Sequence, residues 1–185
     1  GLGLIGLELR AEVVAYVRST RPEVVLEGEL GYIGSSSALL DALPAGAAVR
    51  DEDLTRPDEA RLFVDETGVP LLAPAVGNVH GMLRGGANPS IDTARIRAIR
   101  RAVESPLVLH GGSGIRDEEF TAAIDAGISN VHISTELRVA WRRGIEGGLA
   151  RSPDEIAPYK ILPAAEEAVY RVALERLKLF NKLVY

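Results

Sequence analysis

Three histidines carry the clearest chemical signal in this sequence. His80, His110 and His132 are its only histidines, and each follows a short apolar run that is typical of a buried strand. About one strand–helix repeat separates each run from the next, so their carboxyl ends are expected side by side at one rim of a parallel sheet. Imidazole nitrogens are standard Zn²⁺ ligands, and an open zinc site needs three protein ligands. The pattern predicts a metal or catalytic site at that rim, although a single histidine there would indicate only a packed or surface residue.

Two carboxylates stand where they can join this cluster. Glu27 and Glu29 are two positions apart in the run EVVLEGELG, so their side chains point to the same side of a strand. Because a buried carboxylate without a partner is costly, we expect the pair to meet a metal, an arginine or water. A salt-bridged interior with no functional role is the alternative that these residues leave open.

The glycine-rich turn after His110 predicts a phosphate site. The segment 111–114 (GGSG) lies between a strand and the start of a helix, where free backbone N–H groups and the positive end of the helix attract anions. At the next strand end, Ser134 and Thr135 stand at the start of another helix. In a barrel, two such neighbouring turns match the phosphate site after the last two strands. Thr135 as a plain helix cap is the alternative for the second turn.

The elements that must position these residues alternate along the chain. Apolar periodicity and capping residues predict strands over 23–30, 69–81, 106–114 with its loop, and 128–134. They predict helices over 8–19, 55–68, 90–105, 116–127, 135–150 and 164–183. The segment 35–53 is expected to be a long loop with one helical turn. This order favours an α/β fold in one domain, 1–185, with parallel strands joined by right-handed crossovers.

Composition excludes several classes of function. The chain of 185 residues has a net charge of −5, which opposes nucleic-acid binding. It has no cysteine, so a disulfide framework or a thiolate metal site is excluded. The absence of cysteine is consistent with a protein of the reducing cytoplasm, which is the location we expect. No apolar run reaches the roughly 18 residues that span a bilayer, so we expect no membrane partner.

Four motifs in this order resemble one known family. LEGELG, VGNVHG, LVLHGGSGI and ISTELR, together with RPDEARLFVDETG, resemble the class II, zinc-dependent fructose- and tagatose-bisphosphate aldolases over residues 24–141. The resemblance implies a (β/α)8 TIM barrel, of which this chain carries the C-terminal half, with strands 5 to 8. It implies reversible aldol cleavage of a phosphorylated ketose into dihydroxyacetone phosphate and an aldehyde, as in glycolysis. It also implies a Zn²⁺ cofactor, with a monovalent cation left open, and a homo-oligomer.

The resemblance assigns roles to particular residues. It makes His80 and His110 zinc ligands, and Glu29 the glutamate that can approach the metal. The family has an asparagine where this chain has His132, so we expect His132 to be a third ligand or an acid–base group. Together, the turns and the resemblance give the following candidates for phosphate and substrate binding: Gly81, Gly111, Gly112, Ser113, Ser134 and Thr135.

Two further departures from the family limit these expectations. The family's Asp-His pair, which supplies a zinc ligand and a proton donor, is missing from this sequence, and the Gly-Gly-Glu loop is replaced by GYIGSSS, with Ser35 at the second glycine. A TIM barrel needs about 250 residues, so strands 1 to 4 have no room here. We therefore expect a segment of a longer protein, or else a half-barrel that pairs, with weak or no aldolase activity alone. The alternatives are a non-catalytic sugar-phosphate-binding half-barrel and a different phosphate-binding barrel enzyme.

Overall fold

The central element of the fold is a four-stranded parallel sheet. The computed structural model describes residues 4–86 and 88–183. The strands are β1 (Glu27–Leu30), β3 (Leu71–Pro74), β5 (Leu107–Leu109) and β6 (Ile128–Val131), and they lie in that order. All three pairings are parallel, and a helix connects each strand to the next. The predicted alternation of strands and helices is therefore present.

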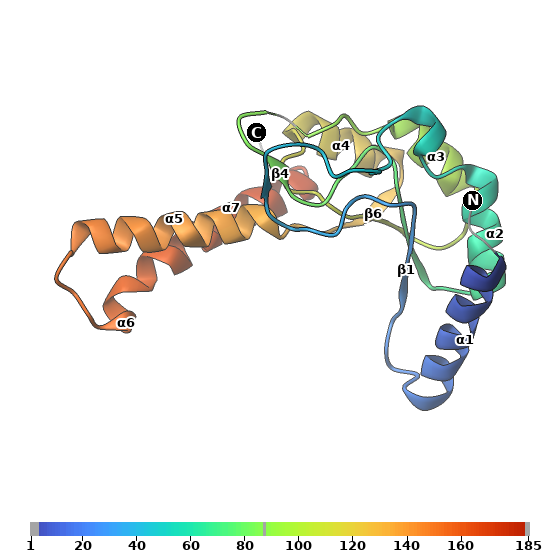
Figure 1. The fold of residues 1–185 in the computed structure, drawn as a ribbon, viewed down its shortest axis with the longest axis horizontal. Coiled ribbons are helices and arrows are strands. Elements are labelled where there is room, and N and C mark those ends of the chain that lie inside the picture. Colours follow the sequence, from blue (N-terminus) through green and yellow to red (C-terminus); the bar gives the residue numbers. More distant parts are fainter. Residues whose placement is uncertain (1–3, 87, 184–185) are drawn as a thin grey trace.

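Three helices cover one face of the sheet. They are α2 (Pro57–Thr67), α3 (Thr93–Ala102) and α4 (Asp117–Ala126), and consecutive ones pack against each other along the outer side of the strands (Figure 1). The core between them and the sheet is apolar and closed to solvent. Its largest members are Phe63, Leu72, Val76, Ile96, Ile99, Leu107, Leu109 and Phe120.

Local signals in the sequence explain where these helices begin and end. Pro57 opens α2, because a residue in the first turn needs no N–H partner, and the Glu59 side chain accepts the Arg56 N–H in front of it. Gly68 ends the helix in the left-handed conformation, with φ 64°. Asp92 caps α3 by accepting the N–H of Arg95 at 2.8 Å.

The strands are shorter than the apolar runs that predict them. The first begins at Glu27 rather than at residue 23, and Val25 before it is 68% exposed. Along β1, Gly28 and Leu30 are buried, while Glu27 and Glu29, which alternate with them, are half-buried. This alternation directs both carboxylates to the face of the sheet that the three helices leave open.

Smaller elements border the open face. Helix α1 (Leu4–Thr20) packs on α2. The segment 35–53 contains a short strand, β2 (Leu39–Leu40), and a 3-10 turn, η1 (Asp51–Asp53), as the sequence predicts in outline. Strand β2 pairs in parallel with β4 (Met82–Leu83), and this small sheet brings residues near Ser37 beside the loop that follows β3.

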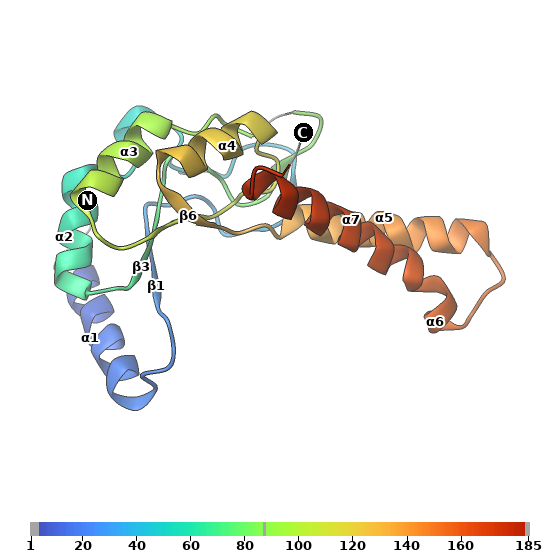
Figure 2. The same ribbon diagram turned by 180° about the vertical axis from the view of Figure 1, so that it is seen from behind.

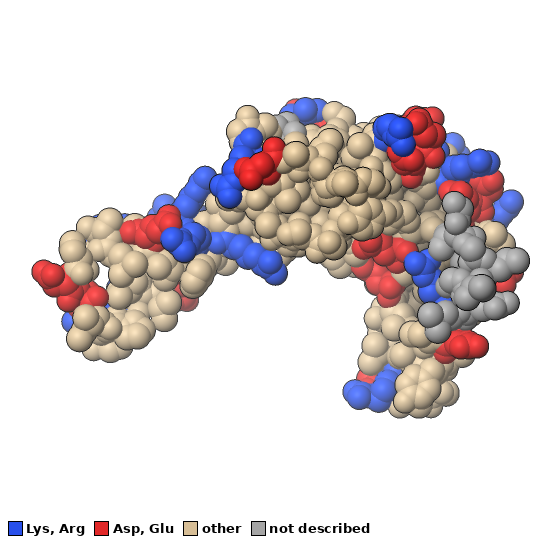
Figure 3. Space-filling model, viewed as in Figure 1, with Lys and Arg blue, Asp and Glu red and all other residues tan. Residues whose placement is uncertain are grey.

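The C-terminal helices form an arm that projects from the body. Helix α5 (Thr135–Arg151) runs outward, α6 (Pro158–Ile161) makes the turn, and α7 (Pro163–Phe180) returns along α5 (Figure 2). The last helix stops at Phe180, before the predicted 183, because Lys182 takes a positive φ of 55° and the Leu183 N–H bonds back to Lys178. Basic side chains gather where the arm leaves the body (Figure 3). No helix among the described residues is long and apolar enough to cross a membrane.

Candidate metal and phosphate site

His110 lies between two carboxylates at the end of β5. Its Nδ1 is 2.8 Å from Oε2 of Glu29, and its Nε2 is hydrogen-bonded to Oε1 of Glu27. The His110 side chain is only 15% exposed, so both contacts are partly shielded from water. The two strand positions that point to the open face therefore meet the same imidazole, one at each ring nitrogen.

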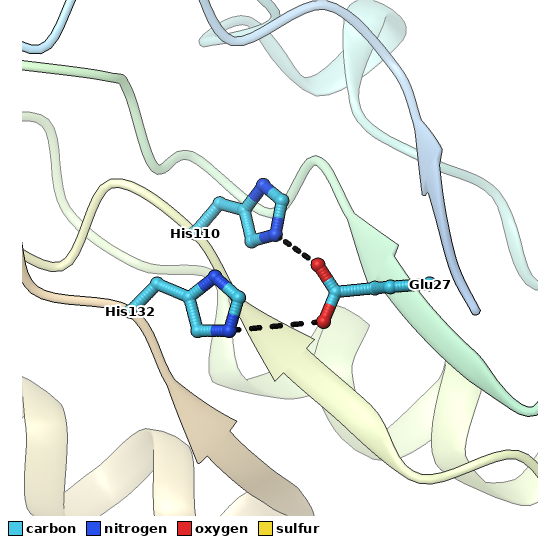
Figure 4. Close-up of side chains that lie close together, drawn as sticks. All are labelled: Glu27, His110 and His132. Carbon is cyan, nitrogen blue, oxygen red and sulfur yellow. Dashed lines mark hydrogen bonds and ion pairs between the residues drawn. The ribbon is translucent and has the colours of Figure 1, made fainter. Parts of the chain in front are cut away.

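His132 lies against the same ring. Its imidazole stacks on that of His110, with ring centroids 4.7 Å apart and planes inclined by 20°. Its Nε2 is 3.7 Å from the second oxygen of Glu27 (Figure 4). His132 thus faces the histidine rim, as its predicted role requires.

His80 joins the cluster from the loop after β3. Its ring centroid is 5.6 Å from that of His110. Its Nδ1 is 2.7 Å from the carbonyl oxygen of Gly34, and this contact selects the tautomer in which Nδ1–H donates. The lone pair of Nε2 is then free for a metal ion, which is the usual arrangement of a metal-binding histidine. The sequence prediction that three strand ends bring the imidazoles together is confirmed.

The carboxylates change the proton affinity of the cluster. The hydrogen bond from His110 holds the pKa of Glu29 below its usual 4.5, against burial, which raises it. The hydrogen bond to Glu29 in turn raises the pKa of His110 above 6.5; burial opposes this shift and the bond to Glu27 adds to it. In the metal-free protein, therefore, a proton on His110 interacts with the same carboxylate oxygen atoms that a bound cation would contact.

The donor set fits a zinc ion. Glu29, His80 and His110 each offer one ligand atom, and these atoms lie within 4.8 Å of one another. Glu27, His110 and His132 meet the same criterion. Neighbouring donors of a tetrahedral zinc lie roughly 3.3 Å apart, so small side-chain movements suffice in either group. Two imidazoles and one carboxylate, with a coordination position left for water or substrate, are a composition typical of catalytic zinc.

A pocket opens beside the histidines. It has a volume of about 220 Å³, and the loops after β3, β5 and β6 form its walls. Most of the predicted site residues meet there. Glu29, which contacts His110, and Gly112 lie outside the lining. The lining consists of Ser37, His80, Gly81, His110, Gly111, Ser113, His132, Ser134 and Thr135.

The glycine turn has the backbone shape that the sequence indicates. Gly111 has φ 58°, and a Cβ there would lie 2.1 Å from the carbonyl oxygen of Val79, so only glycine fits. The N–H groups of Gly111 and Ser113 have no hydrogen-bond partner among the described residues, which leaves them free for an anion. The N–H of Gly112 instead donates to the carbonyl of His132 at 3.1 Å. The amide of Gly112 therefore joins two strand ends and is not available to a phosphate.

Ser113 connects the glycine turn to α5. Its hydroxyl oxygen accepts the N–H groups of Ser134 at 3.3 Å and Glu136 at 3.1 Å, and the residue is buried. Ser134 is the N-cap of α5, so Thr135 is the first helical residue and not the cap. The buried Thr135 keeps its place in the pocket lining.

Sequence reasoning missed two residues that hold the site. Asn78 is buried after β3; its side chain accepts the Val76 N–H and donates to the carbonyl of His110 at 3.0 Å. Asn88 is also buried, and it donates to the carbonyl oxygens of Gly81 and Ser113, both at 2.9 Å. An asparagine inside the motif VGNVHG is the only signal that pointed to Asn78, while Asn88 lies in a segment that showed none.

Comparison with known proteins places these features in a family. A model of the class II fructose-bisphosphate aldolases matches residues 7–183. The fructose-bisphosphate aldolase of Thermus caldophilus is 34% identical to this chain, and the alignment covers 86% of this chain and 58% of that protein. The fructose-bisphosphate aldolase of Geobacillus stearothermophilus is 32% identical, and the alignment covers 95% of this chain and 57% of that protein. This chain therefore spans little more than half the length of these relatives.

Solved structures agree on the fold. The YdjI aldolase of Escherichia coli K12 has a TM-score of 0.67 and 30% identity, and the alignment covers 94% of this chain and 54% of that one. A putative fructose-1,6-bisphosphate aldolase of Coccidioides immitis has a TM-score of 0.75 and 25% identity, with coverages of 95% and 57%. The fold is thus α/β, the C-terminal half of a (β/α)8 TIM barrel, as predicted.

Proposed function

The chain belongs to the class II fructose-bisphosphate aldolase family, and from that premise we propose that it supplies the metal- and phosphate-binding half of a ketose-bisphosphate aldolase. The proposed reaction is the reversible cleavage of a carbon–carbon bond in a phosphorylated ketose, which gives dihydroxyacetone phosphate and an aldehyde. One observation carries the proposal: His80, His110 and two residues of the glycine turn, Gly111 and Ser113, line a single pocket.

Glu29, His80 and His110 are the proposed zinc ligands. A zinc ion bound by these residues would supply Lewis-acid polarisation of the ketose carbonyl. The protein prepares the ligands through their neighbours, because Gly34 fixes the tautomer of His80 and Asn78 holds the backbone at His110. Glu29 contributes a carboxylate that is already ionised, since its pKa is lowered.

The phosphate group of the substrate is proposed to bind at the other side of the pocket. Gly111, Ser113 and Thr135, the first residue of α5, line the pocket together with Gly81 and Ser134, and backbone N–H groups at such a turn and helix N-terminus attract anions. Binding energy from the phosphate, which does not react, orients the reacting carbons beside the histidines. Gly112 supports this site through its bond to the next strand end rather than by contact with phosphate.

A binding experiment tests this function directly. Titration calorimetry of dihydroxyacetone phosphate into the zinc-loaded chain is expected to show binding that a chelator weakens. Thr135→Ala is expected to weaken it as well, whereas Thr93→Ala, the matching first residue of α3, leaves it unchanged because α3 does not line the pocket. Binding that is insensitive to the chelator would favour a sugar-phosphate-binding protein without metal chemistry.

Turnover tests the second half of the proposal. Zinc-loaded chain supplied with fructose 1,6-bisphosphate is expected to release dihydroxyacetone phosphate slowly or not at all, because the sequence has no Asp-His pair. An ordinary enzymatic rate from the 185 residues would show that other groups replace that pair.

A further inference from the structure

We propose that Glu27, His110 and His132 form a second cation site, distinct from the group of Glu29, His80 and His110. The two groups share His110 and use opposite edges of its ring. The proposal concerns metal binding alone and does not depend on the aldolase function.

The positions of the three side chains support this second site. Glu27 reaches Nε2 of His110 with one carboxylate oxygen, and its other oxygen is 3.7 Å from Nε2 of His132 (Figure 4). The candidate ligand atoms of the three residues lie within 4.8 Å of one another. They come from three different strands or strand ends, so the sheet itself holds them in place.

The environment is suited to an ion that enters from solvent. His132 is 53% exposed, while Glu27 is 21% and His110 15% exposed. The ion would therefore meet one accessible imidazole first and two partly desolvated ligands behind it. Two imidazoles and a carboxylate favour Zn²⁺ or Co²⁺, since Mg²⁺ and Ca²⁺ prefer oxygen ligands.

The shared histidine makes the two sites alternatives. A neutral imidazole has one nitrogen lone pair, and its other nitrogen carries a proton. Glu29 faces Nδ1 and Glu27 faces Nε2, so the tautomer of His110 determines on which side an ion is bound. We therefore expect one ion per chain in the wild type, and one ion still when either group alone is disabled.

Zinc titrations of paired variants test this site. His80→Asn removes a ligand from the first group only, so this variant is expected to bind one zinc ion through Glu27, His110 and His132. His80→Asn combined with His132→Asn removes a ligand from both groups. Its affinity should fall by at least the roughly tenfold to hundredfold that loss of an outer-shell partner costs. His80→Asn combined with Asn130→Ala is the control, because Asn130 is exposed on β6 and belongs to neither group.

The outcomes separate this proposal from the proposed function. If His80→Asn abolishes zinc binding while circular dichroism shows an unchanged fold, the second site is wrong and the first stands. If the two His80→Asn variants, with and without His132→Asn, bind zinc equally, the second site is also wrong. If wild type and His80→Asn bind equally and His132→Asn lowers the affinity of both, the second site stands and the first fails. Co²⁺ absorption spectra of folded His80→Asn give an independent readout, since loss of His132 should change them.

Discussion

The imidazole of His132 is stacked on that of His110, with 4.7 Å between the ring centroids. Backbone hydrogen bonds beyond the paired strands fix this relationship. The His132 N–H donates to the carbonyl oxygen of Leu109 at 2.9 Å, and the Gly112 N–H donates to the carbonyl oxygen of His132 at 3.1 Å. The two strand ends thus continue the ladder of β5 and β6 and carry both rings to one rim.

Replacing His110 should weaken zinc binding at both candidate metal groups, because both contain it. His110→Asn is expected to lower zinc affinity by at least roughly a hundredfold, the upper end of the cost for an outer-shell partner. Competition with a chromophoric chelator measures the affinity. Asn130→Ala, an exposed change on β6, is the control and should bind as the wild type does. Wild-type affinity in His110→Asn would exclude both metal groups as described.

Glycine at 111 should be indispensable for the turn. Gly111→Ala places a methyl group 2.1 Å from the Val79 carbonyl oxygen, so it combines a left-handed backbone with a steric clash. Gly46→Ala is the matched control: Gly46 also has a left-handed backbone, with φ 76°, but a Cβ there would have no heavy atom within 4 Å. We expect Gly46→Ala to lower the free energy of unfolding by about 1–2 kcal/mol, and Gly111→Ala by about 1–3 kcal/mol more. Urea denaturation measures both, and equal losses would contradict the clash.

Ser113 should stabilise the junction between the glycine turn and α5. Ser113→Ala leaves the N–H groups of Ser134 and Glu136 without their acceptor, which should cost about 1–3 kcal/mol in the free energy of unfolding. Ser90→Ala is the control, because its exposed hydroxyl accepts, among the described residues, only one long hydrogen bond, at 3.4 Å, from Arg116. Similar urea midpoints for the two variants would show that the Ser113 hydroxyl does not stabilise the junction.

The stability of the metal-free protein should depend on pH through His110 and Glu29. The pKa of His110 is raised above 6.5, so its contribution is complete below that pH and is lost as the pH rises through the folded pKa. The pKa of Glu29 is lowered below 4.5, so its contribution is complete above that pH and is lost as the pH falls through the folded pKa. We expect both residues to contribute fully to the free energy of unfolding between pH 4.5 and pH 6.5, the usual pKa values of the two groups.

Denaturation in the presence of a chelator checks this pH dependence. The urea midpoint should be higher at about pH 5.5 than at about pH 8.5, and His110→Asn should reduce the difference. Excess zinc should instead raise the midpoint at the higher pH, because a metal ion binds the neutral imidazole that the proton has left. A midpoint difference that His110→Asn leaves unchanged would mean that other groups cause it.

The sequence by itself determined the order of elements and the residues at the rim. Apolar runs, proline and glycine caps, and the two-residue period of a strand are local properties, so they predicted the parallel sheet, the convergence of three histidines, and the common face of Glu27 and Glu29. The sequence prediction began β1 too early, at residue 23, because Val24 and Val25 suit a strand by type and yet lie exposed before it.

Only the tertiary structure decided which atoms meet. An irregularity in the register between β5 and β6, at Leu107 and Val108, affects how the two strand ends align, and no pattern in the sequence marks it. The contact of Glu27 with Nε2 of His110, the use of the Gly112 amide and the packing of Asn88 against two loops all depend on such non-local geometry. The physical reason is that side-chain type and period fix the face on which a residue lies, whereas strand register, twist and loop path fix its partner.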